Sequence, residues 1–183
     1  MKIKSLTIYC SASNKINIKY FKMAKEVAEL IANYDIKVIY GGGNVGLMGI
    51  IARTLAGLKK EVIGVIPKFL IKKEKVSLKI NKLKIVPSML KRKEYLFKLG
   101  DAFLILPGGT GTLEEVIEVL SWKILKLHNK PIIFLNFDNY WSPLIKQFEM
   151  IIENKFGNKN LQNQFQVIKN PKQLNKILKS WTK

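Results

Sequence analysis

Short apolar runs of strand length alternate along this chain with segments in which apolar residues recur at helical spacing. The runs at residues 3–9, 38–40, 62–66, 82–86, 102–106, 132–135 and 165–168 predict strands. The segments at residues 20–31, 45–58, 89–99, 113–127, 140–156 and 171–181 predict helices, with Ser88 as a suitable N-cap for the third. Residues 68–81 keep neither period, so we expect a lid or an irregular insertion there.

Alternation of strands and helices is typical of a parallel sheet with helices on both faces. We therefore expect an α/β fold with a Rossmann-like, doubly wound sheet. No internal repeat, linker or charge block divides the chain, so residues 1–183 are expected to form a single domain. In such a sheet, ligands bind outside the carboxyl ends of the strands.

The composition favours a soluble, cytoplasmic protein with no membrane partner. The longest apolar runs are far shorter than the roughly 20 residues that a membrane span needs, and no signal-peptide pattern opens the sequence. Cys10 is the only cysteine, so it cannot form an internal disulfide. Its position at the end of a predicted strand favours a buried packing residue over a nucleophile.

The net charge of +19 raises the question of a nucleic-acid partner. Lysines make up 30 of the 32 basic residues and are spread through nearly every segment, so a dedicated nucleic-acid site is disfavoured. The densest group is interpreted as a solvated face or loop, and it comprises Lys68, Lys72, Lys73, Lys75 and Lys79. Arg53 and Arg92 are the only arginines, and therefore the only candidates for planar, bidentate recognition of an anion.

Two glycine-rich turns follow predicted strands and open predicted helices. The first glycine-rich turn (residues 41–49) has the G-x-G-x-x-G spacing at Gly41, Gly43 and Gly46, whereas the second (residues 107–115) reads PGGTGTLEE. Glycines at such a junction let the backbone approach a ligand, and the N–H groups of the helix start point at an anion. Both turns therefore predict contacts to a phosphorylated ligand.

Neither turn completes a motif for a larger nucleotide. A dinucleotide site also needs an acidic residue at the end of the next strand, where this chain has Ile66, Pro67 and Lys68. A nucleoside-triphosphate loop would end in Lys-Ser/Thr, but Gly46 precedes Leu47 and Gly111 precedes Thr112. A mononucleotide held between strand ends fits these residues better than NAD or ATP.

These motifs, taken with others along the chain, carry a resemblance to a known family. They include the first glycine-rich turn, residues 61–67, Met89-x-x-Arg92-Lys93, the second glycine-rich turn, Trp122 and His128-x-Lys130-Pro131. From about residue 8 to about residue 140 the chain resembles the Lonely Guy family of cytokinin riboside 5'-monophosphate phosphoribohydrolases. The resemblance implies hydrolysis of the N-glycosidic bond of a nucleoside 5'-monophosphate, such as AMP or a cytokinin nucleotide. It also implies a homodimer without a metal or organic cofactor.

The resemblance implies Arg92 and Glu115 as the catalytic pair. A carboxylate beside the anomeric carbon stabilises an oxocarbenium-like sugar and orients water, and Glu115 lies one turn beyond the expected phosphate site. Arg92 would bind phosphate or ribose oxygens, or hold Glu115 ionised. The expected substrate contacts are Ser13, Gly42, Gly43, Glu74, Lys93, Gly108, Gly109, Thr110, Gly111, Thr112, Leu113, Glu114 and Ser121.

Each catalytic candidate has a purely structural alternative. Thr112-x-x-Glu115 fits a capping box, in which Glu115 closes the helix N-terminus. Helical spacing, however, places Glu115 roughly opposite a predicted core stripe and beside an outward apolar face that another subunit would cover. The stripe comprises Leu113, Ile117 and Leu120, and the outward face comprises Val119 and Trp122.

For Arg92 the alternative is a surface ion pair with Glu94 or Glu118. The scarcity of arginine argues against it, since a generic surface charge in this chain would be lysine. His128, the only histidine, is interpreted as a helix-end cap or packing residue, because one histidine and one distant cysteine cannot form a zinc site.

Two residues depart from the family pattern: Ser11 stands where the family has glycine, and Arg53 stands at a position that is commonly acidic. These departures leave open which base the substrate carries. A non-catalytic nucleotide or molybdenum-cofactor carrier of the same superfamily is the alternative function. A decarboxylase has no support, since nothing identifies a pyridoxal-phosphate lysine with its partner acid.

Overall fold

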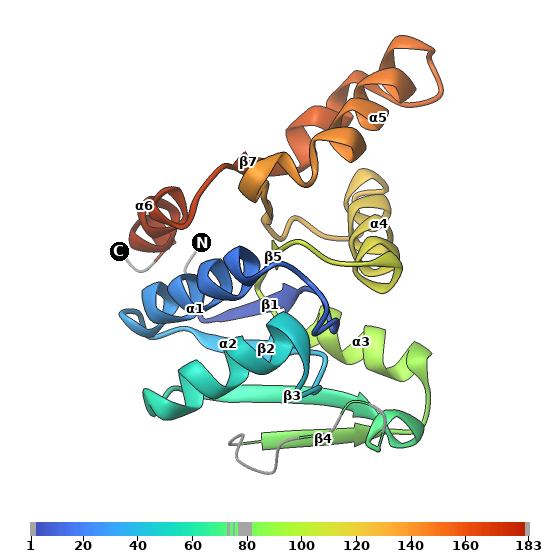
Figure 1. Ribbon diagram of the computed structural model, residues 1–183. Coiled ribbons are helices and arrows are strands. Elements are labelled where there is room, and N and C mark those ends of the chain that lie inside the picture. The colour runs from blue at the N-terminus through green and yellow to red at the C-terminus, as the bar shows by residue number, and fades with distance from the viewer. Residues whose placement is uncertain (1–2, 73, 75, 77–81, 182–183) are drawn as a thin grey trace.

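A seven-stranded, wholly parallel sheet forms the centre of the molecule (Figure 1). The computed structural model describes residues 3–72, 74, 76 and 82–181. The strand order is β4-β3-β2-β1-β5-β6-β7, which confirms the predicted doubly wound α/β fold. The strands are β1 (Ser5–Tyr9), β2 (Lys37–Tyr40), β3 (Val62–Pro67), β4 (Lys82–Val86), β5 (Ala102–Ile105), β6 (Ile132–Leu135) and β7 (Gln166–Ile168).

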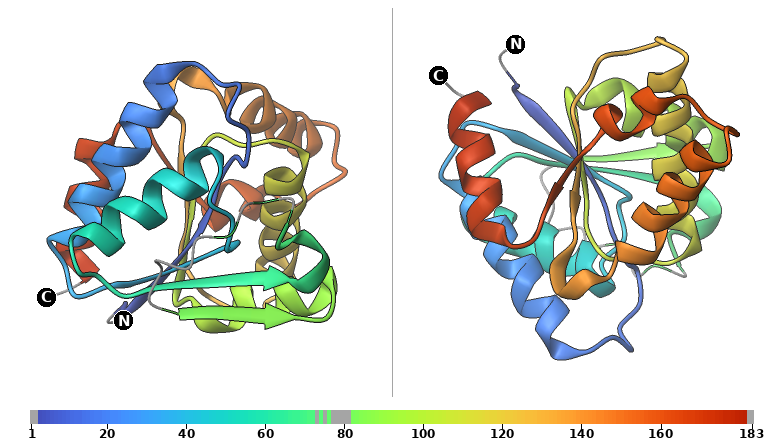
Figure 2. Two further views of the ribbon diagram at one scale, coloured as in Figure 1. Left: turned by 60° about the horizontal axis from the view of Figure 1, so that its bottom comes forward. Right: turned by 90° about the horizontal axis from the view of Figure 1, so that it is seen from above.

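Helices cover both faces of this sheet, as Figure 2 shows. One face carries α1 (Ile18–Ala32), α2 (Gly46–Gly57) and α6 (Pro171–Trp181), and the other carries α3 (Met89–Leu99), α4 (Thr110–Ile124) and α5 (Ser142–Glu153). The short 3-10 helices are η1 (Lys68–Leu70), η2 (Phe137–Asn139) and η3 (Lys159–Gln164). Each face has its own apolar core, so the central strands are buried on both sides.

Local sequence accounts for where several elements begin. The Asn17 side chain accepts a hydrogen bond from the Lys19 N–H at the start of α1. Ser88 caps α3 in the same way by accepting from the Lys91 N–H, as its position predicts. β5 is a run of four buried apolar residues, which is the pattern of a strand covered on both faces.

The segment between β3 and β4 begins with η1, and residues 73, 75 and 77–81 lie outside the described residues. The predicted lid and the lysines at positions 73, 75 and 79 therefore stay predictions. None of the helices in the described ranges is both long and apolar enough to span a membrane.

The order of the strands reverses direction between β1 and β5. These two neighbours are paired from Leu6 with Ala102 to Tyr9 with Ile105, so their carboxyl ends lie side by side. β1 leads into α1 on one face, whereas β5 leads into α4 on the other. The loops consequently part at this point and leave a crevice, which is where ligands bind in doubly wound sheets.

Candidate active site

A cavity of about 310 Å³ opens at the carboxyl ends of β1 and β5. The loop after β1, the first glycine-rich turn, the segment after η1, and the starts of α3 and α4 all line it. Arg92, Glu74 and Glu115 reach it from three different elements. The topology thus brings these three side chains together, although Glu74 and Glu115 are 41 positions apart in the sequence.

The second glycine-rich turn presents an open helix N-terminus to this cavity. α4 begins at Thr110 with Gly109 as its N-cap, and no side chain caps it. A Cβ atom built on Gly109 or Gly111 would meet nothing within 4 Å, so the backbone is accessible there. Residues 109–112 line the cavity, which places the first N–H groups of α4 at its wall, as the sequence predicts for a phosphate site.

The capping-box alternative for Glu115 is wrong. It requires Thr112 as the N-cap, but the N-cap of α4 is Gly109, three residues earlier, and the Gly109 carbonyl already accepts from the Leu113 N–H at 3.0 Å. The Thr112 side chain is buried and packs against Gly108, where an added Cβ would lie 2.2 Å from the Thr112 Oγ1. Glu115 is therefore not needed to close the helix end.

The predicted core stripe of α4 is wrong in part. Leu113 and Ile117 are exposed, whereas Thr112, Val116, Val119 and Leu120 are buried. The buried stripe is rotated because Val116, Val119 and Leu120 pack into the apolar core beneath α4.

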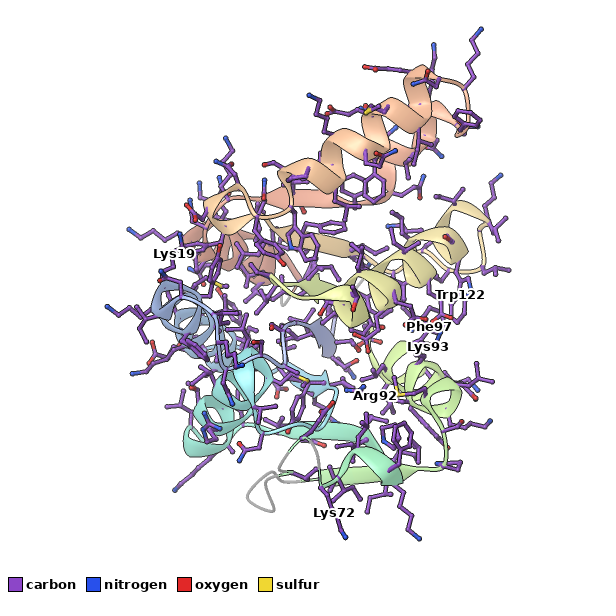
Figure 3. The ribbon with its side chains drawn as sticks, turned by 45° about the vertical axis from the view of Figure 1, so that its right-hand side comes forward. Lys19, Lys72, Arg92, Lys93, Phe97 and Trp122 are labelled. Atoms are coloured by element: carbon purple, nitrogen blue, oxygen red, sulfur yellow. The ribbon has the colours of Figure 1, made fainter. Side chains whose placement is uncertain are left out.

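Glu115 therefore lies beside the buried stripe rather than opposite it, and it lines the cavity. The predicted outward face is also corrected, since Val119 is buried. Trp122 lies edge-on against Phe97 of α3, with ring centroids 4.8 Å apart (Figure 3).

The environment of Glu115 shifts its acidity strongly. Burial raises the pKa of the Glu115 carboxyl to about 7; Arg92 opposes this shift, and Glu114 and Glu74 add to it. A carboxyl with a pKa near neutrality is suited to acid–base work. Perturbed groups of this kind in a cavity are typical of functional sites.

Arg92 is held inside the molecule by backbone carbonyl groups. It is 7% exposed, its Nε donates to the Val65 carbonyl at 3.2 Å, and its Nη2 donates to the Gly41 carbonyl at 2.8 Å. A guanidinium has five N–H donors, so these two bonds leave donors for a ligand in the cavity that Arg92 lines. Figure 3 shows Arg92 on α3, close to the ends of the strands.

The surface ion pair proposed as the alternative for Arg92 is wrong. Glu94 instead pairs with Lys91 and Lys98, at 2.8 Å and 2.7 Å. Glu118 pairs with Lys93. Both acidic groups therefore have lysine partners, whereas Arg92 is buried and bonds backbone carbonyls.

Lys93 lies between α3 and α4, outside the residues that line the cavity (Figure 3). Its Nζ donates to Glu114 at 2.5 Å and to Glu118 at 3.0 Å. Both carboxylates raise the pKa of Lys93, so its positive charge is stabilised there. Lys93 thus ties the first turns of α4 to α3, and Glu114, which does line the cavity, is one of its partners.

Glu74, an expected substrate contact, lines the cavity. Its backbone carbonyl accepts from the Asn44 N–H at 3.0 Å. Gly43 lies against it, since a Cβ there would be 2.4 Å from the Glu74 Oε2. Gly42 has a φ of +80°, a conformation that favours glycine. Gly43 is therefore placed beside Glu74 and Gly42 against Val65 and Ile66 of β3, while Gly41 and Met48 are the members of this turn that line the cavity.

The first glycine-rich turn is closed by the protein itself, which corrects the expectation of two phosphate-binding turns. The Gly46 N–H donates to the Asn14 Oδ1 at 2.7 Å, and the Leu47 N–H donates to the Ser11 carbonyl at 2.9 Å. A Cβ on Gly46 would lie 2.5 Å from the carbonyl carbon of Ala12. The first N–H groups of α2 thus donate to the loop after β1, and the backbone of that loop occupies the space beside Gly46 that a phosphate would need.

Four other expected contacts remain, and three of them lie outside the cavity. Ser13 lines the cavity, and its N–H donates to the Ser11 Oγ at 3.0 Å. Leu113 and Ser121 do not line it; Ser121 instead faces a separate groove between α4 and residues 148–164. Gly108 lines a neighbouring cavity of about 210 Å³, which shares Gly109 with the first and is also lined by Tyr140.

The cavity wall also contains Tyr9, which the motifs did not single out. It is the last residue of β1, and its ring stacks on Phe103 with centroids 5.8 Å apart. Burial and then the nearby Glu115 charge raise the pKa of the Tyr9 hydroxyl. The position of Tyr9 at the end of β1 could have identified it, because the strand ends at the point where the strand order reverses border the ligand site in this fold.

Cys10 and His128 have the structural positions that the sequence predicts. Cys10 is buried at the base of the cavity, and burial raises the pKa of its thiol. The His128 Nδ1 accepts from the Lys130 N–H at 3.1 Å, so the Nε2 carries the proton and donates to the Val119 carbonyl at 2.8 Å. His128 therefore packs beyond the end of α4, away from the cavity.

Sequence comparisons identify the family. A family model described as "Possible lysine decarboxylase" matches residues 48–178. The cytokinin riboside 5'-monophosphate phosphoribohydrolase of Rhodococcoides fascians is 41% identical over 147 residues, which cover 80% of this chain and 74% of that protein. The phosphoribohydrolase LOG1 of Arabidopsis thaliana is 37% identical over 155 residues, covering 85% and 73% respectively. This chain belongs to the Lonely Guy family.

Solved structures agree with this Lonely Guy family fold. The molybdenum cofactor carrier protein of Chlamydomonas reinhardtii superposes with a TM-score of 0.74 at 16% identity, covering 99% of this chain and 98% of that one. The molybdenum cofactor binding protein of Rippkaea orientalis gives a TM-score of 0.69 at 20% identity, with 98% of both chains covered. At these identities the likeness is one of fold alone.

Proposed function

We propose that this Lonely Guy family protein hydrolyses the N-glycosidic bond of nucleoside 5'-monophosphates. The products are the free base and ribose 5-phosphate. One observation carries the proposal: a carboxyl with its pKa raised to about 7, an uncapped helix N-terminus and a buried arginine all line the same cavity. The names of the relatives support the same reaction class.

The reaction begins with the phosphate. In the proposed complex it binds the N–H groups of residues 109–112, which suit a dianion because the helix dipole adds to their donors. The ribose then extends along the first turn of α4 toward Glu115. Fixing the sugar in this way supplies positioning, which is worth several kcal/mol of a reaction barrier.

Glu115 and Arg92 act at the anomeric carbon. The ionised Glu115 stabilises positive charge on the sugar as the C–N bond breaks, and it accepts a proton from the attacking water. The water oxygen bonds to the anomeric carbon, and the electron pair of the broken bond leaves with the base, which takes up one proton. Arg92, fixed by the carbonyls of Gly41 and Val65, holds sugar or phosphate oxygens and favours the ionised form of Glu115.

The base would occupy the side of the cavity lined by Gly41, Met48, Glu74 and Met89. A carboxylate beside two thioethers suits a purine, whose amino group donates to Glu74 while its ring contacts the methionines. Both AMP and N6-substituted cytokinin nucleotides fit this chemistry. We expect a homodimer, as the family resemblance implies, and sedimentation measures it.

The test is direct. The protein is incubated separately with AMP and with isopentenyladenosine monophosphate, and free base and ribose 5-phosphate are quantified. Equal amounts of both products from either nucleotide support the proposal. Retained ligand without product favours a non-catalytic carrier, and no base release from any purine monophosphate overturns the enzymatic proposal.

A further inference from the structure

A tyrosine from outside the cavity supports the phosphate loop from behind. The Tyr140 hydroxyl donates to the Gly108 carbonyl at 2.6 Å. Gly108 directly precedes Gly109, the N-cap of α4. The two residues are 32 positions apart in the sequence, so this contact joins the segment after β6 to the loop after β5.

Peptide geometry gives this hydrogen bond a consequence on the opposite side of the loop. The Gly108 carbonyl and the Gly109 N–H belong to one planar trans peptide, so they point in opposite directions. Tyr140 lies on the side of the neighbouring cavity, which it lines together with Gly108 and Gly109. Holding the carbonyl toward Tyr140 therefore turns the Gly109 N–H toward the candidate active site, which Gly109 also lines.

Packing alone does not hold the loop on this side. The neighbouring cavity of about 210 Å³ separates the loop from Tyr20 and Ile16. Glycines lack side chains that would anchor the loop, and they carry the largest conformational freedom. On this side of the loop, the hydrogen bond from Tyr140 is therefore the contact that fixes the orientation of the Gly108 carbonyl.

The turn that carries Tyr140 is strained, and the rest of the structure maintains that strain. Asp138 and Asn139 are consecutive residues with φ of +55° and +57°, in the left-handed region. Such residues persist where surrounding contacts over-determine them, and they are concentrated at functional sites. These two residues turn the chain immediately before Tyr140, whose hydroxyl contacts the loop.

Hydrogen bonds anchor this turn at several points. The buried Asn136 accepts from the Trp141 N–H at 2.7 Å and donates from its Nδ2 to the Ser142 Oγ at 3.0 Å. Asp138 forms an ion pair with Lys19. The Tyr140 ring itself packs edge-on against Tyr20 and Trp141, with centroids 6.0 Å and 5.0 Å away.

We propose that Tyr140 is a positioning residue for phosphate recognition, acting through the Gly108–Gly109 peptide. This inference rests on the proposed function, because that function places the substrate phosphate at residues 109–112. Its specific consequence is that Tyr140 contributes to the binding of phosphorylated ligands and leaves the chemical step unchanged.

The test compares Tyr140→Phe with the wild type and with Tyr20→Phe. Tyr20 is a matched control because it lines the same neighbouring cavity and packs on Tyr140, whereas the hydroxyl that donates to the Gly108 carbonyl belongs to Tyr140. Loss of one hydrogen bond predicts a KM for AMP that is about threefold to tenfold higher in Tyr140→Phe, with kcat within about twofold. Tyr20→Phe should keep both constants.

Calorimetric binding separates this inference from the proposed reaction. Ribose 5-phosphate is expected to bind Tyr140→Phe about threefold to tenfold more weakly, while adenosine, which has no phosphate, binds both forms equally. If AMP is not hydrolysed but this selective loss is measured, the proposed reaction fails and the positioning role stands. Equal weakening toward adenosine, or unchanged binding of ribose 5-phosphate, overturns the role of Tyr140.

Discussion

The two glycine-rich turns of this protein follow β2 and β5, the parallel strands on either side of β1, yet only the second opens a helix whose first N–H groups line the cavity. At the first turn, Asn14 and Ser11 accept hydrogen bonds from the N–H groups at the start of α2. At the second, α4 begins without a side-chain cap, and Gly109 and Gly111 face open space. The difference arises from what packs against each turn, not from glycine spacing.

This comparison assigns different roles to similar motifs. The first turn is a structural joint that holds the loop after β1 and supports the wall containing Glu74. The second is the candidate binding surface, with Glu115 one turn further along its helix. A G-x-G-x-x-G spacing therefore has no fixed meaning until the partners of its N–H groups are known.

The largest effect that separates the turns is expected from Glu115→Gln. This change keeps the size of the side chain and removes the charge that the sugar requires, so kcat should fall by about 10²- to 10⁴-fold. Binding of AMP, measured by calorimetry, should remain within about fivefold of wild type, because the variant keeps the contacts that hold the substrate before the bond breaks. Full turnover by the variant contradicts a catalytic role for Glu115.

The two arginines provide the next comparison. Arg92→Lys removes a fork whose nitrogens bond the Gly41 and Val65 carbonyls, and kcat/KM should fall by about 10²-fold. Arg53→Lys is the control, because Arg53 is exposed and bonds Asn44 in the closed turn, and its kcat/KM should stay within about twofold. Steady-state kinetics of the two variants measure these changes. An equal loss of kcat/KM in both would contradict the different roles given to the two turns.

Paired glycine substitutions test the same distinction through stability. Gly46→Ala introduces a Cβ 2.5 Å from Ala12 at a φ of +59°, and it should lower the free energy of unfolding by about 2–4 kcal/mol. Gly111→Ala meets open space within a helix and should change it by less than about 1 kcal/mol. Urea denaturation measures both, and an equal cost at the two positions contradicts the assignment of closed and open turns.

The pH dependence should separate Glu115 from the structural carboxylates. Its pKa rises from 4.5 to about 7 on folding, so between these values the folded state binds more protons and stability falls as pH rises. The contribution is at most about 3 kcal/mol, and it should be absent in Glu115→Gln. In the same range kcat/KM should increase with pH and level off above about 7, since the ionised form acts. A flat profile in both measurements would contradict the raised pKa.

Much of the fold could be predicted from the sequence because its determinants are local. Alternating apolar runs and helical periods give every strand and long helix in the described ranges, and Ser88 is recognisable as a cap before its partner is known. The parallel topology follows from the same alternation. Arg92 and Glu115 could also be predicted from their motifs, and both lie in one cavity.

Properties that depend on which surface packs where could not be predicted. The capping box and the first phosphate site both have correct spacing, but Gly109 starts α4 early and Asn14 occupies the start of α2. Helical periodicity alone could not fix the buried stripe of α4, since both candidate stripes are apolar. Tyr140 gave no sign of its role, because the carbonyl it holds is 32 residues away in the sequence.

The most direct measurement is the crystal structure of Glu115→Gln with AMP bound. The inactive variant traps the substrate, so phosphate, sugar and base are all located in one experiment. The account predicts the phosphate on the N–H groups of residues 109–112, with the anomeric carbon beside position 115 and Arg92. A phosphate bound at the first glycine-rich turn, or an anomeric carbon far from position 115, would contradict it.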